Sequence, residues 1–179
     1  MEYHFGIGIE DALKLLKPNS IDIVVSRSVL EHVHYIDAAM HNINKILVPG
    51  GLMIHKIDLR EHKMFNSKKF HPLEFLTIPR PLYNLMTKYS GKPNRKLMDY
   101  YFYKIIDLGY YFKILITSII GNENELEKYI ELSSFNYKLN NKANNLVEEI
   151  RPSLCREFRT MSKKNLMVSG IFLIAKKTC

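Results

Sequence analysis

The chain has 179 residues, of which 46% are hydrophobic and 25% are charged, a composition typical of globular proteins and not of disordered or fibrous ones. Its longest apolar stretch, residues 110–121, is shorter than the roughly 20 residues that a membrane-spanning helix needs, so we expect no membrane partner. Lysine and arginine give a net charge of +8, but they are scattered along the chain, and we expect no nucleic-acid partner.

Cysteine content and chain length set the remaining bounds. The two cysteines, Cys155 and Cys179, form no CxxC motif and suggest no disulfide framework. No signal peptide follows Met1, so we expect a cytoplasmic protein. The length predicts a single domain over residues 1–179.

The first strong pattern is a strand, helix and strand unit. Residues 21–26 form an apolar run rich in β-branched side chains, which predicts a buried strand. Apolar residues then recur at helical spacing over 36–47, which predicts a helix. A proline and two glycines after this segment stop the helix, and residues 51–58 again have the pattern of a strand. A connection of this length predicts two parallel strands joined by a right-handed crossover.

The later part of the chain is predicted to complete an α/β fold. Residues 59–94 show no sustained period and are predicted to form a partly helical, lid-like insertion. A helix is expected over 95–108, a strand over 110–119, and short helices around 126–132 and 143–150. The apolar run 166–176 predicts a final strand, antiparallel to the preceding one at an edge of the sheet.

Polar side chains follow both strands of the first unit. Ser26, Glu31 and His32 come at or soon after the end of the first strand, while Asp58 ends the second strand and His62 comes soon after it. Since the carboxyl ends of neighbouring parallel strands lie at the same edge of a sheet, we expect these groups to line one crevice. Histidine and carboxylate side chains exchange protons near neutral pH, so the sequence predicts an acid-base site there.

Three segments in order carry a family resemblance: the strand Ile21–Ser26, the Val-Leu-Glu-His-Val turn at 29–33, and Ile-Leu-Val-Pro-Gly-Gly at 46–51. Together they resemble the class I S-adenosylmethionine-dependent methyltransferases, in particular the type 11 branch. The resemblance implies a Rossmann-like sheet, S-adenosylmethionine as cofactor, and methyl transfer to a small molecule.

The sequence also departs from that family. The family's acidic, glycine-rich loop and the acid that ends its second strand are not found, and the segment between Gly6 and Asp22 is too short to hold two further strands. We therefore expect an amino-terminally truncated, partial methyltransferase domain, in which Glu2–Phe5 is the remnant of the family's third strand. Weak cofactor binding and impaired activity are expected.

The resemblance implies a role for each candidate residue. His32 or His62 would act as the base, Glu31 or Asp58 would orient it, and Ser26 would lie against the cofactor. Glu10 or Asp11 would lie near the adenine amino group. No metal is expected, because the spacing of the histidines gives no three-ligand array; these are His32, His34, His41, His55 and His62.

Two other functions stay open. A missing first strand would leave 21–26 with an unpaired apolar edge, so the chain could be a catalytically inactive, Rossmann-like interaction module that forms a homo-oligomer through this edge. The net charge leaves a basic nucleic-acid binder as a second alternative. Arg95 and Arg151 are candidates either for an anionic substrate group or for ordinary ion pairs.

Overall fold

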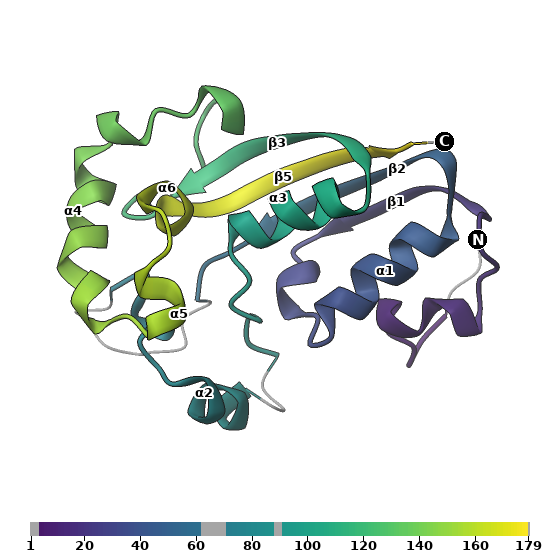
Figure 1. Ribbon diagram of the computed structural model, residues 1–179, viewed down its shortest axis with the longest axis horizontal. Helices are drawn as coiled ribbons and strands as arrows, with labels where there is room; N and C mark the ends of the chain where they lie inside the picture. The colour runs from purple at the N-terminus through teal and green to yellow at the C-terminus, as the bar shows by residue number, and fades with distance from the viewer. Residues whose placement is uncertain (1–3, 62–70, 88–90, 179) are drawn as a thin grey trace.

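The computed structural model describes residues 4–61, 71–87 and 91–178 of the chain (Figure 1). Its strands are β1 (Ile21–Arg27), β2 (Leu47–Asp58), β3 (Tyr110–Ile119), β4 (Ile130–Glu131) and β5 (Val168–Lys177). Its α-helices are α1 (Ile36–Ile46), α2 (Arg80–Thr87), α3 (Met98–Asp107), α4 (Asn141–Ile150), α5 (Arg156–Arg159) and α6 (Lys163–Met167). Two short 3-10 helices, η1 (Ile9–Lys14) and η2 (Leu30–His32), flank β1.

The strands form one mixed sheet in the order β1-β2-β5-β3-β4. β1 and β2 are parallel and are joined through α1, which confirms the predicted strand, helix and strand unit. Their register sets Ser26 beside His55. The predicted α/β fold class, a Rossmann-like sheet with helices, is thus confirmed.

The position of the last strand differs from the expectation. β5 is antiparallel to its neighbours, as predicted, but it lies inside the sheet between β2 and β3 and not at an edge. Ile171, Leu173 and Ala175 of β5 are fully buried. An apolar strand of this kind is most stable when strands pair with it on both sides. The edges of the described sheet are β1 and the two-residue strand β4.

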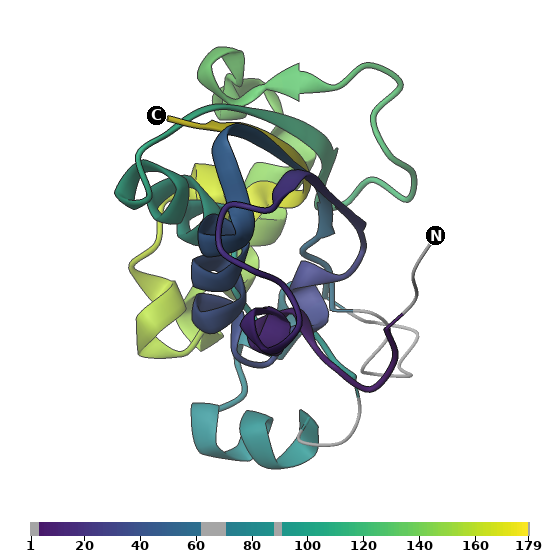
Figure 2. The same ribbon diagram turned by 90° about the vertical axis from the view of Figure 1, so that its right-hand side faces the viewer.

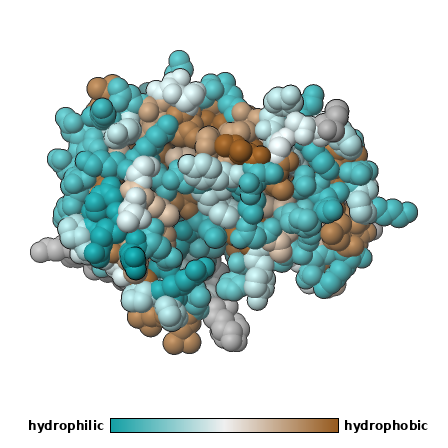
Figure 3. Space-filling model, in the orientation of Figure 1, coloured by the Kyte–Doolittle hydropathy of each residue, from teal (hydrophilic) through white to brown (hydrophobic). Residues whose placement is uncertain are grey.

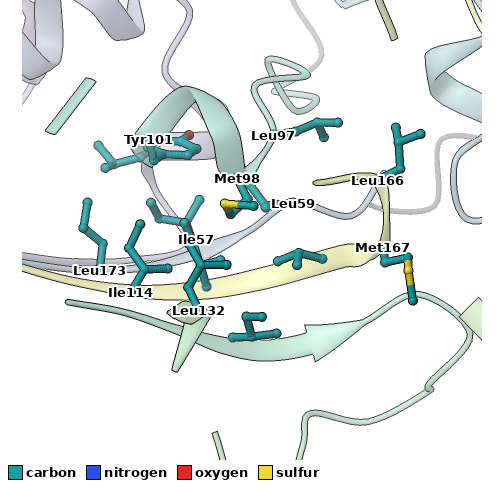
Figure 4. Close-up of a cluster of buried hydrophobic side chains, with 14 of the residues drawn as sticks. Ile57, Leu59, Leu97, Met98, Tyr101, Ile114, Leu132, Leu166, Met167 and Leu173 are labelled. Atoms are coloured by element: carbon teal, nitrogen blue, oxygen red, sulfur yellow. The ribbon is translucent and has the colours of Figure 1, made fainter. Parts of the chain in front are cut away.

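Helices cover one face of the sheet. Figure 2 shows α1 and α3 on one side, while the chain between β3 and β4 passes on the other, where Glu125 pairs with Lys56 of β2. The core lies between the helices and the sheet: in Figure 4, Met98 and Tyr101 of α3 lie next to Ile57 of β2. Figure 3 shows that the helix-covered face is largely hydrophilic, with brown apolar surface at the bottom over α2, near the centre around α3 and at the right beside α1.

The β1 edge exposes apolar side chains. Ile23 is 54% and Val25 67% exposed, and in the described part of the chain β1 pairs with β2 alone. The predicted apolar edge at this strand is therefore present, but the predicted burial of the strand is wrong, because Ile23 and Val25 lie on the face of the sheet opposite the helices. Oligomerisation through it stays a prediction.

Other elements differ in detail. Residues 126–132 do not form the predicted helix, because Leu126 donates its backbone N–H to the carbonyl oxygen of Thr117 and Ile130–Glu131 pairs with β3. The predicted helices at 95–108 and 143–150 are present as α3 and α4. His4 and Phe5 are not in a strand, and Glu2 lies outside the described residues.

The insertion at 59–94 is partly helical, as predicted. It contains α2 and a 3-10 turn at Glu74–Leu76, while 62–70 and 88–90 lie outside the described residues. Its function as a lid and the single-domain organisation of 1–179 stay predictions. Within the described ranges, no helix is both long and apolar enough to cross a bilayer.

The interior position of β5 predicts a large effect of truncating its side chains. Leu173→Ala should lower the free energy of unfolding by about 2–5 kcal/mol, because the fully buried leucine leaves a cavity between the sheet and the helices. Urea denaturation followed by circular dichroism measures this loss. Lys176→Ala, at an exposed position of the same strand, is the control. Equal losses in the two variants would contradict the interior placement.

Candidate functional site

The carboxyl ends of β1 and β2 lie side by side. The backbone N–H of Ser28 donates to the carbonyl oxygen of Lys56 at 2.9 Å, which extends the parallel pairing one residue past the end of β1. Ser28 has a left-handed backbone (φ 51°), which turns the chain sharply into η2. This turn returns Glu31 to the end of β2.

Glu31 joins the two strand ends. Its side chain is buried, with 1% exposed, and its Oε1 atom accepts a hydrogen bond from the backbone N–H of Asp58 at 3.2 Å. The other oxygen, Oε2, is buried with no hydrogen-bond partner among the described residues. Burial raises the pKa of Glu31 above its ordinary value of 4.5, an effect that hydrogen bonds to backbone groups partly offset.

Asp58 is engaged by a neighbouring arginine. Its carboxylate accepts hydrogen bonds from Nε of Arg60 at 2.9 Å and from Nη2 of Arg60 at 2.6 Å. Such a two-pronged pair fixes the geometry of both groups. Asp58 therefore orients Arg60 in this structure, and its backbone N–H is the group that contacts Glu31.

Ser26 contacts the second strand on the helix-covered face. Its Oγ atom shares a hydrogen bond of 2.7 Å with Nδ1 of His55. Burial lowers the pKa of His55 to about 4, so the imidazole is neutral at pH 7. Its Nε2 atom is buried without a partner among the described residues. Strand alternation, with Met53 and Ile57 on the same face, is the sequence signal that predicts the burial of His55.

His32 lies on the wall of a large cleft. The side chain is exposed and faces a cavity of about 1020 Å³, in the size range of small-molecule sites. The cleft lies between η2, α2, α3, α5 and the segment 91–97. His62, the other predicted base, lies outside the described residues.

Asn94 is a site residue that sequence reasoning missed. Its Nδ2 atom donates to the carbonyl oxygens of Leu30 at 2.9 Å and Val33 at 3.0 Å, and its backbone N–H donates to the carbonyl oxygen of Glu31 at 2.7 Å. These bonds hold the turn that carries His32. A single asparagine in an irregular segment gives no sequence signal for such a role.

The two predicted adenine-binding acids lie ahead of β1. Glu10 and Asp11 belong to η1, where the backbone carbonyl of Glu10 accepts from Asn42 of α1 and Asp11 pairs with Lys14 at 2.8 Å. The structure brings Glu31 into contact with Asp58, and its contacts do not join Glu10 or Asp11 to this pair. Across the described ranges, no three His, Cys, Asp or Glu side chains are grouped closely enough to hold a metal ion.

A family model agrees with the resemblance found in the sequence. The model described as a methyltransferase domain matches residues 6–55, the region that contains β1, η2, α1 and most of β2. This match confirms the resemblance to methyltransferases over that region. A search of curated proteins finds no significant match.

Solved methyltransferase structures also align with the chain. An S-adenosylmethionine-dependent methyltransferase from Archaeoglobus fulgidus has 13% identity and a TM-score of 0.48, over 96% of this chain and 66% of that one. One from Thermotoga maritima has 12% identity and a TM-score of 0.47, over 92% and 59%. Phosphoethanolamine N-methyltransferase 2 of Haemonchus contortus, in complex with S-adenosyl-L-methionine, has 15% identity and a TM-score of 0.45. This last alignment covers 92% of the present chain but only 35% of the length of the Haemonchus enzyme.

The buried carboxyl of Glu31 predicts a pH-dependent stability. Because folding raises its pKa, the native state loses stability as the pH rises from the unfolded value of 4.5 through the folded value. Glu31→Gln mimics the protonated form and should be more stable than the unaltered protein at pH 8, by about 1 kcal/mol or more, because burying a carboxylate costs more than burying a neutral amide.

Urea denaturation between pH 4 and pH 8 measures this difference. The two proteins should converge near pH 4, where Glu31 is protonated in both states. His55 has a folded pKa below its ordinary value of 6.5, so it removes stability as the pH falls from 6.5 toward 4, equally in both proteins. A Gln variant that is less stable than the unaltered protein at pH 8 would show that the charged carboxylate stabilises the fold.

Proposed function

We propose that this chain forms part of a methyltransferase that uses S-adenosylmethionine as cofactor and methylates a small molecule. A glycine-rich loop that binds the cofactor would come from polypeptide outside the described residues. The observation that carries the proposal is the pairing of two parallel strand ends, where Glu31 accepts a hydrogen bond from the Asp58 amide and His32 lies on the cleft wall. The family-model match over residues 6–55 supports it.

The described residues fit only one side of a cofactor site. Ser26 at the end of β1 is bonded to His55, and Gly170, the glycine beside the end of β2, has its Cβ position filled by the hydroxyls of Thr117 and Ser118. These residues therefore give no backbone cradle for a nucleoside at the strand ends. Impaired cofactor binding by this chain alone is part of the proposal, as are cofactor contacts from Glu10 and Asp11.

S-adenosylmethionine, when bound, supplies an electrophilic methyl group on its sulfonium. The task of the chain's own residues is to hold the acceptor in line and to remove its proton. In this proposal, a ring nitrogen of His32 takes the proton of the acceptor hydroxyl or amine, and His62 is the other candidate for this role. Glu31 and Asn94 act as positioning residues, because they fix the turn on which His32 stands.

The exposed edge of β1 favours a second candidate function. Ile23 and Val25 present apolar surface beside an edge with unpaired backbone groups, which suits the addition of a strand from another chain. In this alternative the chain is a catalytically inactive interaction module. A stable dimer in sedimentation, together with a lack of cofactor binding and of methyl transfer in every form of the protein, would favour it over the methyltransferase.

The partial cofactor site predicts weak binding. Calorimetric titration of the 179-residue chain with S-adenosylmethionine should give no dissociation constant in the micromolar range, because one wall of the nucleoside site is not supplied by the described residues. S-adenosylhomocysteine serves as a second ligand that carries no positive charge on sulfur. Micromolar binding of either ligand would show that the chain itself completes the site.

The base assignment predicts a loss of turnover. In a form of the protein that carries a glycine-rich loop ahead of Met1 and transfers labelled methyl groups, His32→Ala combined with His62→Ala should lower turnover at least about tenfold, a conservative bound beside typical general-base effects of about 10²–10⁴-fold. His41→Ala, on the exposed surface of α1, is the control. Unchanged turnover would remove both histidines as bases, and a lack of methyl transfer in the unaltered form would contradict the proposed function.

A further inference from the structure

The cleft beside His32 carries more positive than negative side chains. The basic residues on its wall are Arg80, Lys92, Arg95, Lys96 and Lys104, and the acidic ones are Asp99, Asp107 and Glu157. Tyrosine rings, among them Tyr35 and Tyr100, line the part of the cleft near His32. The cleft thus combines cationic and aromatic surface.

Arg95 is the most deeply placed of these cations. Its side chain is 5% exposed, and its guanidinium lies between the rings of Tyr83, at 4.1 Å from the ring centroid, and Phe158, at 5.1 Å. Nη1 donates to the carbonyl oxygens of Ile78 at 2.7 Å and Phe75 at 3.3 Å. These contacts fix the orientation of the guanidinium.

The charge of Arg95 is only weakly compensated. Nη2 contacts Oε1 of Glu157 at 3.4 Å, a long contact, and the Glu157 side chain is 43% exposed on the four-residue helix α5. Burial lowers the pKa of Arg95, and the nearby charge of Arg80 acts in the same direction. A buried cation with a distant, solvated carboxylate favours a closer oxyanion.

The position of Arg95 connects this cation to the candidate base. Its neighbour Asn94 donates to the carbonyl oxygens of Leu30 and Val33, the residues on either side of Glu31 and His32. Arg95 itself has a left-handed backbone (φ 58°), which turns its side chain from that contact toward α5. A ligand held at Arg95 therefore lies in the same cleft as His32.

We propose that the cleft binds a small molecule through a carboxylate or phosphate group, which Arg95 and Arg80 hold in place of Glu157, with the remainder of the molecule beside Tyr35 and Tyr100. This inference extends the proposed function. It rests on the proposed function in one respect only, namely that the bound ligand is the methyl acceptor. The binding of the anion requires neither the cofactor nor methyl transfer.

Calorimetric titration of the 179-residue chain with benzoate, phenyl phosphate and benzyl alcohol tests the proposal at constant ionic strength. Benzoate or phenyl phosphate should bind, and benzyl alcohol, which has the same ring but no charge, should not. The two anions separate a carboxylate ligand from a phosphate ligand. Binding of benzyl alcohol as strong as that of the anions, or binding of none of the three at millimolar concentration, would overturn the proposal.

Variants of exposed residues locate the anion. Arg80→Gln should weaken binding and Glu157→Gln should strengthen it, each about three- to fivefold, the effect of one partly solvated charge pair. Arg156→Gln, on the exposed surface of α5, should leave binding unchanged. Equal affinities in the Arg80 and Glu157 variants and the unaltered protein would place the anion elsewhere and contradict the assignment. Because no cofactor is present, these results are independent of whether methyl transfer is observed.

Discussion

The candidate site depends on the parallel pairing of β1 and β2. Parallel strands end at the same edge of a sheet, so the side chains that follow them meet although they are far apart in sequence. At the carboxyl end of this pair, the Asp58 amide donates a hydrogen bond to Glu31. Asn94 donates to the carbonyl oxygen of Leu30 and so links the same turn to the wall of the cleft. The position of His32 follows from these three contacts.

The contact between Glu31 and the end of β2 has an energetic cost. Glu31 is buried, and one of its oxygens has no hydrogen-bond partner among the described residues, which destabilises the fold. An apolar side chain would avoid this cost, but it would leave the Asp58 N–H without its acceptor. The carboxyl therefore joins the two strand ends at some expense of stability.

Local pattern predicted most of the fold, and long-range pairing did not follow from it. The β-branched run at 21–26 predicted β1 and the helical spacing over 36–47 predicted α1, but only the second pattern matches the burial of its element, because β1 exposes Ile23 and Val25. The place of β5 between β2 and β3 is decided by which edges pair, and no periodicity within 166–176 carries that information. Residues 126–132 failed as a helix for a related reason, since the edge of β3 offers them backbone partners.

The site was predictable to a similar degree. Glu31 and Asp58 follow strands whose direction the sequence indicated, and the structure places them in contact. The links from Ser26 to His55 and from Asp58 to Arg60 depend on side-chain packing, which a single sequence does not specify. Arg95 was already a candidate for an anionic group in the sequence, whereas the contacts of Asn94 come from an irregular segment and are set by tertiary packing alone.

The backbone of Arg95 has one further consequence. A left-handed conformation costs a residue with a side chain about 1 kcal/mol or more, which glycine avoids. Arginine stands there nevertheless, and its guanidinium contacts with two rings and two carbonyl oxygens act against this penalty. Substitution of Arg95 by glycine would remove the backbone penalty, but it would also remove the cation from the cleft. At this position, a more favourable backbone therefore comes only with the loss of the side chain that the proposed anion site needs.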